Sequence, residues 1–214
     1  MVQRGRRSRG PSEDRRQNLV RAAFECIAAD GFEGLRTRSV AERAGVNIAT
    51  LHYYFASKEA LIGGVAEYLA SQFISLHAKS VTPSGSSGLD RLHQEFADAH
   101  FYYREHPDLA AVLFELQLRG RRDPAIRKII EPLTGHWRAG IETWMQAGVA
   151  EGVFRGDLDP AAGATLLVSA LSGAACLELG AARLDQIFEE VDRWLLPPCG
   201  ASDERPKKKR KPSR

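Results

Sequence analysis

The stretch from Thr37 to Leu61, TRSVAERAGVNIATLHYYFASKEAL, constrains the fold of this chain more than any other segment. Thr37 is expected to cap a short helix, because its hydroxyl can accept from a backbone N–H of the first turn. Counted from Thr37, the chain has a small residue at the fifth position (Ala41), glycine at the ninth (Gly45) and an apolar residue at the fifteenth (Leu51). Two helices that cross steeply through a short turn require this pattern. The stretch therefore predicts a helix-turn-helix.

The second helix of this unit is expected to begin after Asn47, which can cap it. Helical periodicity directs Ile48, Leu51 and Phe55 toward the core. The remaining positions of the helix form an outward face with two flanks: Ala49, Thr50 and Tyr53, with His52 and Tyr54 beside them. This face is almost uncharged and carries hydroxyl and aromatic groups. It is the candidate reader of a DNA major groove.

The chain resembles regulators of the tetracycline-repressor (TetR) family over roughly its first third. The matching residues are Gly31-Phe32, Thr37, Val40-Ala41, Ala44-Gly45-Val46, Thr50-Leu51, Tyr53-Tyr54-Phe55 and Ser57-Lys58-Glu59-Ala60-Leu61. The family usually has tyrosine where this chain has His52. The resemblance implies a DNA-binding head followed by an all-helical body that binds an effector and whose last two helices pair with a second subunit.

The remainder of the chain has helical periodicity and lacks the β-branched alternation of strands. We expect an all-α protein of about nine helices, with a three-helix DNA-binding domain and a larger helical domain for ligand binding and dimerisation. The expected segments are a flexible basic arm at 1–12, the helix-turn-helix domain at 13–60, the effector-binding and dimerisation domain at 61–197 and a disordered basic tail at 198–214. Beyond a connection at 82–88, helices are expected at about 89–105, 108–119, 124–150, 160–180 and 183–196.

Basic residues are concentrated at the two ends of the chain. Residues 1–16 and 205–214 together hold 13 of the 30 Lys and Arg but only two of the 27 Asp and Glu, so the 188 residues between them carry 17 bases and 25 acids. The net negative charge of such a body repels nucleic acid, so contacts with phosphate are expected only from the basic ends and from a few suitably positioned residues. The PKKKRK run in the tail is interpreted as a non-specific DNA-binding segment or as an appended sequence.

Contacts with DNA are expected from two groups of residues. The reading helix and its cap contribute Thr50, Tyr53 and Tyr54 as the first candidates for DNA contact and Asn47, Ala49 and His52 as residues facing base edges. Phosphates are assigned to Arg36, Thr37, Arg38 and Lys58. Lys58 lies in the first turn of a helix capped by Ser57, where a cation is unfavourable for the helix dipole. A phosphate partner accounts for it better than solvent does.

Several aromatic and polar side chains of the body lie on faces expected to turn inward. The candidate ligand-binding residues are Phe96, His100, Tyr103, Leu113, Phe114, Gln117, Trp137, Ile141 and Trp144. Plain core packing is the alternative for each of them. His93 and His100 have neither HExxH spacing nor a thiolate partner, so no metal and no cofactor are predicted. The chain also lacks the GxSxG, P-loop and dinucleotide-binding motifs, so no enzyme activity is expected.

The last two helices carry the candidate dimer interface. The run from Pro160 to Leu177 has no charged residue, but its many small residues favour burial within protein over a membrane span. The interface is assigned to Leu166, Ala170, Gly173, Leu184, Ile187, Phe188, Val191 and Trp194. A monomer that buries the stripe of the last helix internally is the alternative.

These features predict a cytoplasmic, homodimeric, ligand-responsive transcriptional regulator, most simply a repressor released from a palindromic double-stranded DNA operator by a small, largely apolar molecule. A DNA-binding regulator without an effector is the alternative. Neither a membrane partner nor a cofactor is expected. The three cysteines show no CxxC spacing, which suits a reducing compartment, and Cys26 and Cys176 are expected as small apolar fillers.

Overall fold

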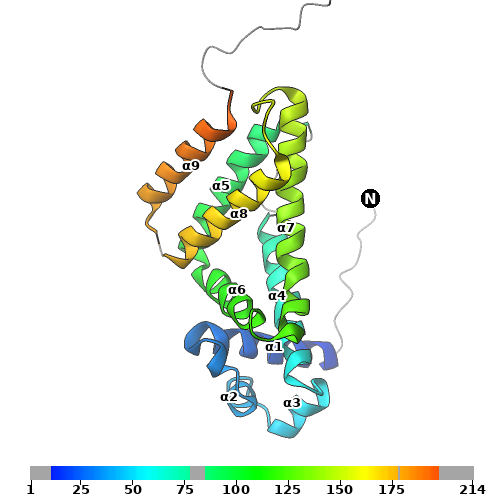
Figure 1. The fold of residues 1–214 in the computed structure, drawn as a ribbon. Coiled ribbons are helices and arrows are strands. Elements are labelled where there is room, and N and C mark those ends of the chain that lie inside the picture. Colours follow the sequence, from blue (N-terminus) through cyan, green and yellow to red (C-terminus); the bar gives the residue numbers. More distant parts are fainter. Residues whose placement is uncertain (1–10, 78–84, 178, 198–214) are drawn as a thin grey trace, which may run out of the picture.

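A computed structural model describes residues 11–77, 85–177 and 179–197, which form nine α-helices, one 3₁₀ turn and no strand (Figure 1). The elements are α1 (Pro11–Asp30), η1 (Phe32–Gly34), α2 (Thr37–Arg43), α3 (Ile48–Tyr54), α4 (Lys58–His77), α5 (Gly88–Glu105), α6 (Pro107–Gly120), α7 (Pro124–Glu151), α8 (Pro160–Cys176) and α9 (Ala181–Leu195). The all-α prediction is confirmed. The predicted arm and tail lie almost wholly outside the described residues, although Pro11 and Ser12 already belong to α1.

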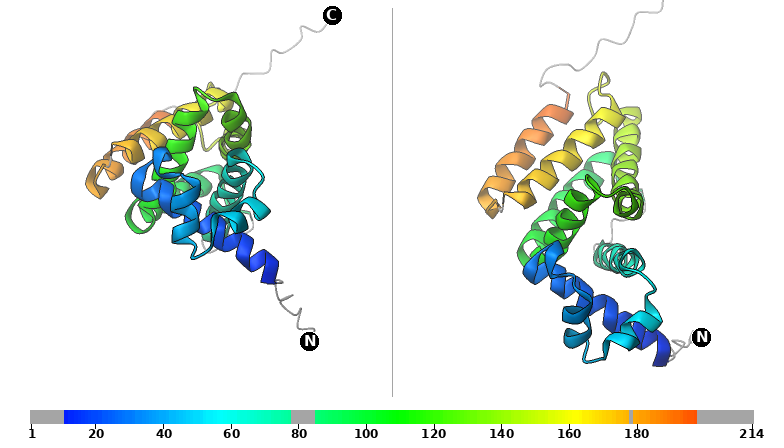
Figure 2. Two further views of the ribbon diagram at one scale, coloured as in Figure 1. Left: turned by 90° about the horizontal axis from the view of Figure 1, so that it is seen from below. Right: turned by 60° about the horizontal axis from the view of Figure 1, so that its bottom comes forward.

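Helices α1 to α3 form a head at one end of the molecule, and α4 continues from the head into the body (Figures 1 and 2). The head has a core built from α1, α2 and the inner side of α3, with Leu19, Val40 and Leu51 all buried. The amide of Asn18 in α1 donates to the carbonyl of Ala44 at 2.9 Å, which ties the first helix to the end of α2. The head is therefore one packed unit and not three separate helices.

The turn between α2 and α3 has the geometry that its glycine permits. Gly45 has φ +66°, a left-handed conformation that costs least without a Cβ. The Gly45 N–H donates to Glu42 and the Val46 N–H donates to Ala41, so two end carbonyls of α2 are satisfied. The start of α2 differs from the prediction: Arg36, in an extended conformation, is the N-cap, and Thr37 is the first helical residue. The Thr37 hydroxyl is thus not the cap that its residue type suggested.

The core of the head continues into the near end of the body. Leu109, Val112 and Leu116 of α6 and Ile126 and Ile130 of α7 belong to the same buried cluster as the head residues. A second buried cluster at the far end joins α5, α7, α8 and α9. The middle of the body lies between the two clusters and belongs to neither of them.

Helix boundaries in the body follow the predicted ranges within a few residues. Ser87 and Asp90 form a reciprocal capping box at the start of α5, and Asp123 and Asp159 cap α7 and α8, each with proline as the first helical residue. Helix α8 ends at Cys176, earlier than predicted. Within the described ranges, no helix combines the length and the apolar character needed to cross a lipid bilayer.

Candidate DNA-binding face and ligand cavity

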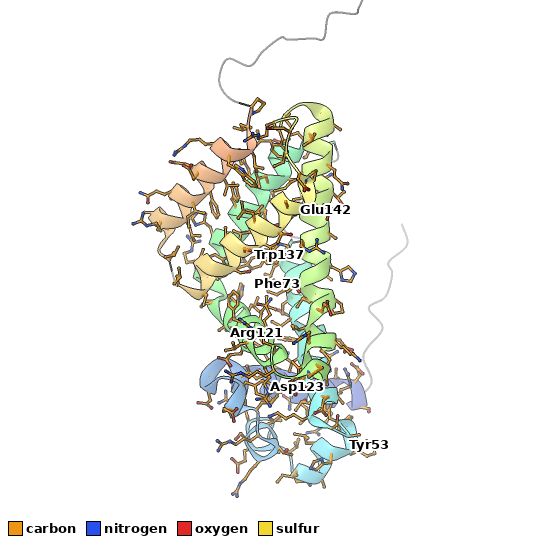
Figure 3. All side chains as sticks on the ribbon, in the orientation of Figure 1. Tyr53, Phe73, Arg121, Asp123, Trp137 and Glu142 are labelled. Carbon is orange, nitrogen blue, oxygen red and sulfur yellow. The ribbon has the colours of Figure 1, made fainter. Side chains whose placement is uncertain are left out.

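Helix α3 presents the face that the sequence assigned to it. Tyr53 is 82% exposed and points away from the molecule (Figure 3), and its ring meets that of Tyr54 edge to face at 5.1 Å. Ala49 and His52 are exposed as well, whereas Thr50 and Tyr54 are half-buried. Ile48 was predicted to face the core, but it is 43% exposed because it lies in the first turn, at the edge of the packed surface. The exposed face of α3 thus includes a large aliphatic group as well as Tyr53.

The first turn of α3 is held by the side chain of Asn47. Its Oδ1 accepts from the Thr50 backbone N–H at 2.7 Å and from the Thr50 hydroxyl at 2.9 Å. This bonding confirms Asn47 as the N-cap. It also fixes the rotamer of Thr50, whose hydroxyl oxygen keeps acceptor capacity while its proton is used inside the protein.

The predicted phosphate-binding residues lie around α3 on neighbouring elements. Arg36 and Arg38 are exposed, Arg36 Nε donates to the Glu33 carbonyl, and Arg38 pairs with Glu42 at 2.9 Å. Lys58 is the first residue of α4, which Ser57 caps by accepting from the Ala60 N–H. An exposed ion pair such as that of Arg38 is worth little, so a phosphate can compete for the guanidinium.

Phe32 forms the junction between the head and helix α6. The Lys58 ammonium lies 4.4 Å from the centroid of its ring, and the Arg119 guanidinium of α6 lies 5.0 Å from it. The Phe32 N–H donates to the Glu115 carboxylate of α6 at 3.0 Å. Gly31 makes this approach possible, since φ +67° with ψ −170° is a conformation almost restricted to glycine. Phe32 of the head is therefore held by two charged residues of one body helix, Glu115 through its backbone N–H and Arg119 through its ring.

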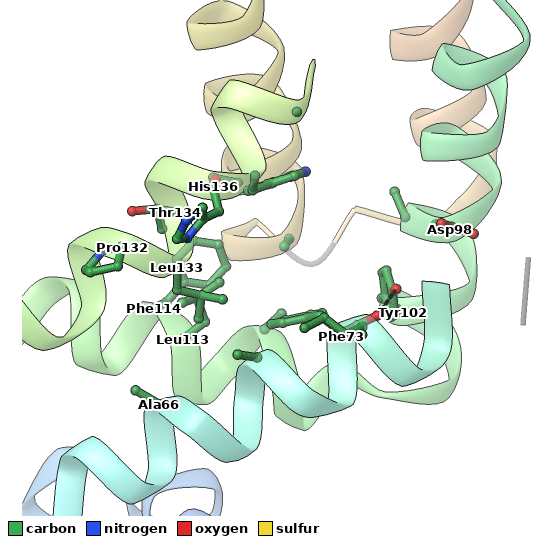
Figure 4. A pocket seen from close by; sticks show the side chains of 18 of the residues that line it. Ala66, Phe73, Asp98, Tyr102, Leu113, Phe114, Pro132, Leu133, Thr134 and His136 are labelled. Carbon is green, nitrogen blue, oxygen red and sulfur yellow. Dashed lines mark hydrogen bonds between the residues drawn. The ribbon is translucent and has the colours of Figure 1, made fainter. Parts of the chain in front are cut away.

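The middle of the body contains a cavity of about 840 Å³, within the usual range for small-molecule sites. Helices α4 to α8 line it, and Figure 4 shows Phe73, Tyr102 and Phe114 converging on it from three of these helices. Trp137 Nε1 donates to Glu95 at 2.6 Å, and the Tyr103 hydroxyl donates to the Leu171 carbonyl at 2.6 Å. The wall is thus largely apolar, with polar groups held in fixed positions.

Five of the nine predicted ligand-binding residues line this cavity: Tyr103, Leu113, Phe114, Trp137 and Trp144. The other four do not. Phe96 stacks on Phe188 with ring centroids 4.1 Å apart, His100 pairs with Asp185 at 2.8 Å, and Ile141 is fully buried in the far core. Gln117 is likewise outside the cavity wall. Phe96, His100 and Ile141 thus meet other helices instead of open space.

Several residues of α4 and α5 that line the cavity were not among those predicted from the sequence. Phe73 belongs to α4, and Glu95, Asp98 and Tyr102 occupy successive turns of α5. Asp98 is only 8% exposed. Burial, together with the nearby charges of Asp98 and Glu95, raises the pKa of Tyr102, so its phenol stays protonated. The signal for this face was the spacing of 95, 98 and 102, which places the three side chains on one helical stripe.

Helix α9 is attached to α5 by two histidine–aspartate pairs. His93 Nε2 lies 2.9 Å from Asp192 and His100 Nε2 lies 2.8 Å from Asp185. No group of three or more residues able to hold a metal ion occurs among the residues that the structure describes. The two histidines thus serve as partners of α9 carboxylates.

Two of the predicted interface residues are buried inside their own chain. Leu184 is 2% exposed and Phe188 is 6% exposed, both in the far core. They have little further area to lose to a second subunit, so their burial does not favour the interface role predicted for them. Leu166 is exposed, and the remaining five are half-buried: Ala170, Gly173, Ile187, Val191 and Trp194. Cys26 is buried, as expected, but Cys176 is exposed at the end of α8.

The head matches a known protein family, and most of the chain is similar to known proteins and to solved structures. The family model described as bacterial regulatory proteins of the tetR family matches residues 19–65. The transcriptional repressor NicS of Pseudomonas putida is 28% identical over 143 residues, 67% of each chain. The nicotine-responsive transcriptional repressor HdnoR of Paenarthrobacter nicotinovorans is 28% identical over 112 residues, 52% of this chain and 57% of that protein. A crystal structure of a putative TetR-family regulator from Rhodococcus sp. superposes with a TM-score of 0.69 at 25% identity, covering 86% of this chain and 99% of that one.

An exposed helix-turn-helix at one end of an all-helical body is the arrangement found in DNA-binding transcriptional regulators. Its head matches the tetR family of bacterial regulatory proteins, and the chain as a whole is similar to transcriptional regulators of that family.

Proposed function

We propose that this chain is a homodimeric repressor that binds a palindromic operator through α3 and releases it when a small, largely apolar molecule occupies the body cavity. The observation that carries the proposal is the double role of α6. Leu113 and Phe114 line the cavity, whereas Glu115, the next residue, and Arg119, one turn further along the helix, hold Phe32 of the head. A ligand that displaces α6 must therefore act on the head.

Helix α4 supplies a second connection between the two sites. It begins at Lys58, beside the ring of Phe32, and reaches the cavity wall at Phe73. The fifteen-residue separation corresponds to about 22 Å along one continuous helix. A tilt of α4 at the cavity is thus transmitted to the residue that we assign to phosphate.

In the DNA-bound state, the outward side of α3 enters the major groove. Tyr53, Ala49 and His52 face base edges, Thr50 offers its hydroxyl oxygen as an acceptor, and the exposed Ile48 suits a thymine methyl group. Arg36, Thr37, Arg38 and Lys58 contact phosphates, which sets the register without reading sequence. Asn47 holds the first turn and offers its amide donors, while the half-buried Tyr54 supports Tyr53.

Repression follows from the spacing of two such heads. Two reading helices on a two-fold axis reach half-sites about 34–36 Å apart, and a ligand that favours another spacing weakens binding. It can do so only by its difference in affinity for the two conformations. The effector-responsive relative HdnoR supports an effector for this chain as well.

The proposal is tested by selecting bound duplexes from a random pool with purified full-length protein at moderate salt. We expect enrichment of an inverted repeat whose half-site centres are about 10 base pairs apart. Enrichment of a single half-site without symmetry would contradict the dimeric arrangement, and no enrichment would contradict the operator itself. If no small molecule stabilises the protein in a thermal-shift screen, the result would favour the alternative function, a DNA-binding regulator without an effector.

A further inference from the structure

Aromatic rings from four helices dominate the wall of the cavity. They belong to α4, α5, α6 and α7: Phe73, Tyr102, Tyr103, Phe114, Trp137 and Trp144. The rings of Phe73 and Tyr102 already meet edge to face, with their centroids 5.5 Å apart. Aromatic pairs gain free energy beyond that of the area they bury, so this wall favours an aromatic ligand over a saturated one of similar size.

Several polar groups of this wall are already bonded within the protein. Trp137 Nε1 donates to Glu95 at 2.6 Å, and the Tyr103 hydroxyl donates to the Leu171 carbonyl at 2.6 Å. Neither Glu95 nor Asp98 is without a partner. These groups therefore need no hydrogen bond from a ligand.

The hydroxyl of Tyr102 differs from these groups. Its acceptor is the Phe73 carbonyl at 3.5 Å, whereas a well-formed O–H···O bond measures about 2.5–3.0 Å. Tyr102 and Phe73 lie next to each other at the cavity (Figure 4). Burial raises the pKa of Tyr102, so the phenol keeps its proton. A ligand in the cavity can therefore accept from this hydroxyl at a shorter distance than the Phe73 carbonyl does.

The acceptor that suits this donor is a neutral oxygen. An ionised carboxylate would lose its hydration against a largely apolar wall, and this loss costs more than one hydrogen bond to a phenol returns. An ammonium group has donors only, so it cannot accept the Tyr102 proton. A ketone, ester or ether oxygen accepts the proton at a much smaller desolvation cost.

We infer that the effector of this cavity is an uncharged aromatic molecule with a neutral acceptor oxygen, and that this oxygen accepts from the Tyr102 hydroxyl. The inference rests on the proposed function, because it names the class of ligand for the same cavity. When the ligand accepts this bond, the hydroxyl gives up its long contact with Phe73 of α4. Recognition at α5 then changes a contact of the helix that begins at Lys58.

The test uses four probes: 2-acetylnaphthalene, 2-isopropenylnaphthalene, methyl decahydro-2-naphthyl ketone and 2-naphthoate. The isopropenyl probe replaces the ketone oxygen by a CH₂ group, the decahydro probe replaces the aromatic rings by saturated ones, and the naphthoate carries a charge. Their affinities for the full-length protein are measured by equilibrium dialysis. We expect 2-acetylnaphthalene to bind at least about tenfold more tightly than 2-naphthoate, which must be desolvated as an ion.

Two adjacent tyrosines provide a substitution and its matched control. Tyr102→Phe removes the hydroxyl and keeps the ring, so the ratio of the acetyl to the isopropenyl affinity should fall by about three- to tenfold. Tyr103→Phe removes a hydroxyl that the Leu171 carbonyl already accepts from, so the same ratio should stay within about twofold of the parent value.

A third substitution tests the preference for an aromatic ligand. Phe114→Leu removes one ring of the wall and keeps an apolar side chain. It should lower the affinity for 2-acetylnaphthalene about two- to tenfold more than the affinity for the decahydro ketone, because only the aromatic probe loses a ring–ring contact. The decahydro ketone is the internal control for the shape of the cavity.

Three outcomes overturn the inference while the cavity still binds ligands and the proposed effector response stands. Tyr102→Phe leaves the ratio of acetyl to isopropenyl affinity unchanged, or Tyr103→Phe lowers it as much. The naphthoate binds as tightly as 2-acetylnaphthalene. Phe114→Leu weakens the aromatic and the saturated ketone equally. If none of the four probes binds up to its solubility limit, the proposed effector response fails together with the inference.

Discussion

The hydrogen bond between Phe32 and Glu115 offers the sharpest perturbation of the junction between head and body. The Phe32 N–H donates to the half-buried carboxylate at 3.0 Å, and a hydrogen bond to a charged acceptor contributes about 1.5–3 kcal/mol. Glu115→Ala removes the acceptor and leaves the N–H without it. We therefore expect the free energy of unfolding to fall by about 2 kcal/mol, which corresponds to a melting temperature lower by about 4–8 °C.

Amide hydrogen exchange measures this bond directly. A local loss of about 2 kcal/mol accelerates exchange of the Phe32 N–H by roughly thirtyfold. Glu115→Gln keeps an uncharged acceptor and should have a smaller effect. Glu131→Ala, which removes an exposed carboxylate of α7, is the control. Unchanged exchange at Phe32 in Glu115→Ala would refute the junction, because the acceptor would then contribute nothing to its protection.

Further substitutions test the phosphate contact and the packing of the body. Lys58→Ala should weaken DNA binding and flatten the dependence of log affinity on log salt by about one, with little change in stability because Lys58 is exposed. An unchanged salt slope would remove Lys58 from the phosphate contacts. Gly148→Ala should lower the free energy of unfolding by about 1–3 kcal/mol in chemical denaturation, since its Cβ would lie 2.2 Å from the Phe154 ring. Gly135→Ala on the same helix meets nothing within 4 Å and should be neutral or stabilising by up to about 1 kcal/mol, so equal losses in the two variants would contradict the packing argument.

The head could be predicted from sequence because its signals are local. The turn glycine Gly45 and the cap Asn47 act on residues within three or four positions, and both are found as expected. Thr37 shows the limit of such signals. A threonine at the start of a helix can be either the N-cap or the first helical residue. Here Arg36 has the extended conformation of the N-cap, so Thr37 is the first helical residue.

The cavity could be predicted only in part, because periodicity gives the direction of a side chain but not what it meets. Phe96 and Trp137 both lie on inward faces, yet Phe96 stacks on Phe188 of α9 while Trp137 faces the cavity. The outcome depends on where α9 packs, 85 to 99 residues further along the chain, through the pairs of His100 and His93. The same packing buries Leu184 and Phe188. The apolar stripe to which they belong does not reveal, from sequence alone, whether it packs inside its own chain or against a second subunit.

The reading of DNA by α3 is the central claim, and it is tested most directly by repeating the duplex selection with Tyr53→Ala. Because Tyr53 is 82% exposed, the variant should fold and melt like the parent protein. We expect sequence preference to relax at one position in each half-site, symmetrically about the centre of the operator, with a loss of about 1–3 kcal/mol for each base contact. An enriched sequence and an affinity identical to those of the parent protein would show that the exposed face of α3 does not read the operator.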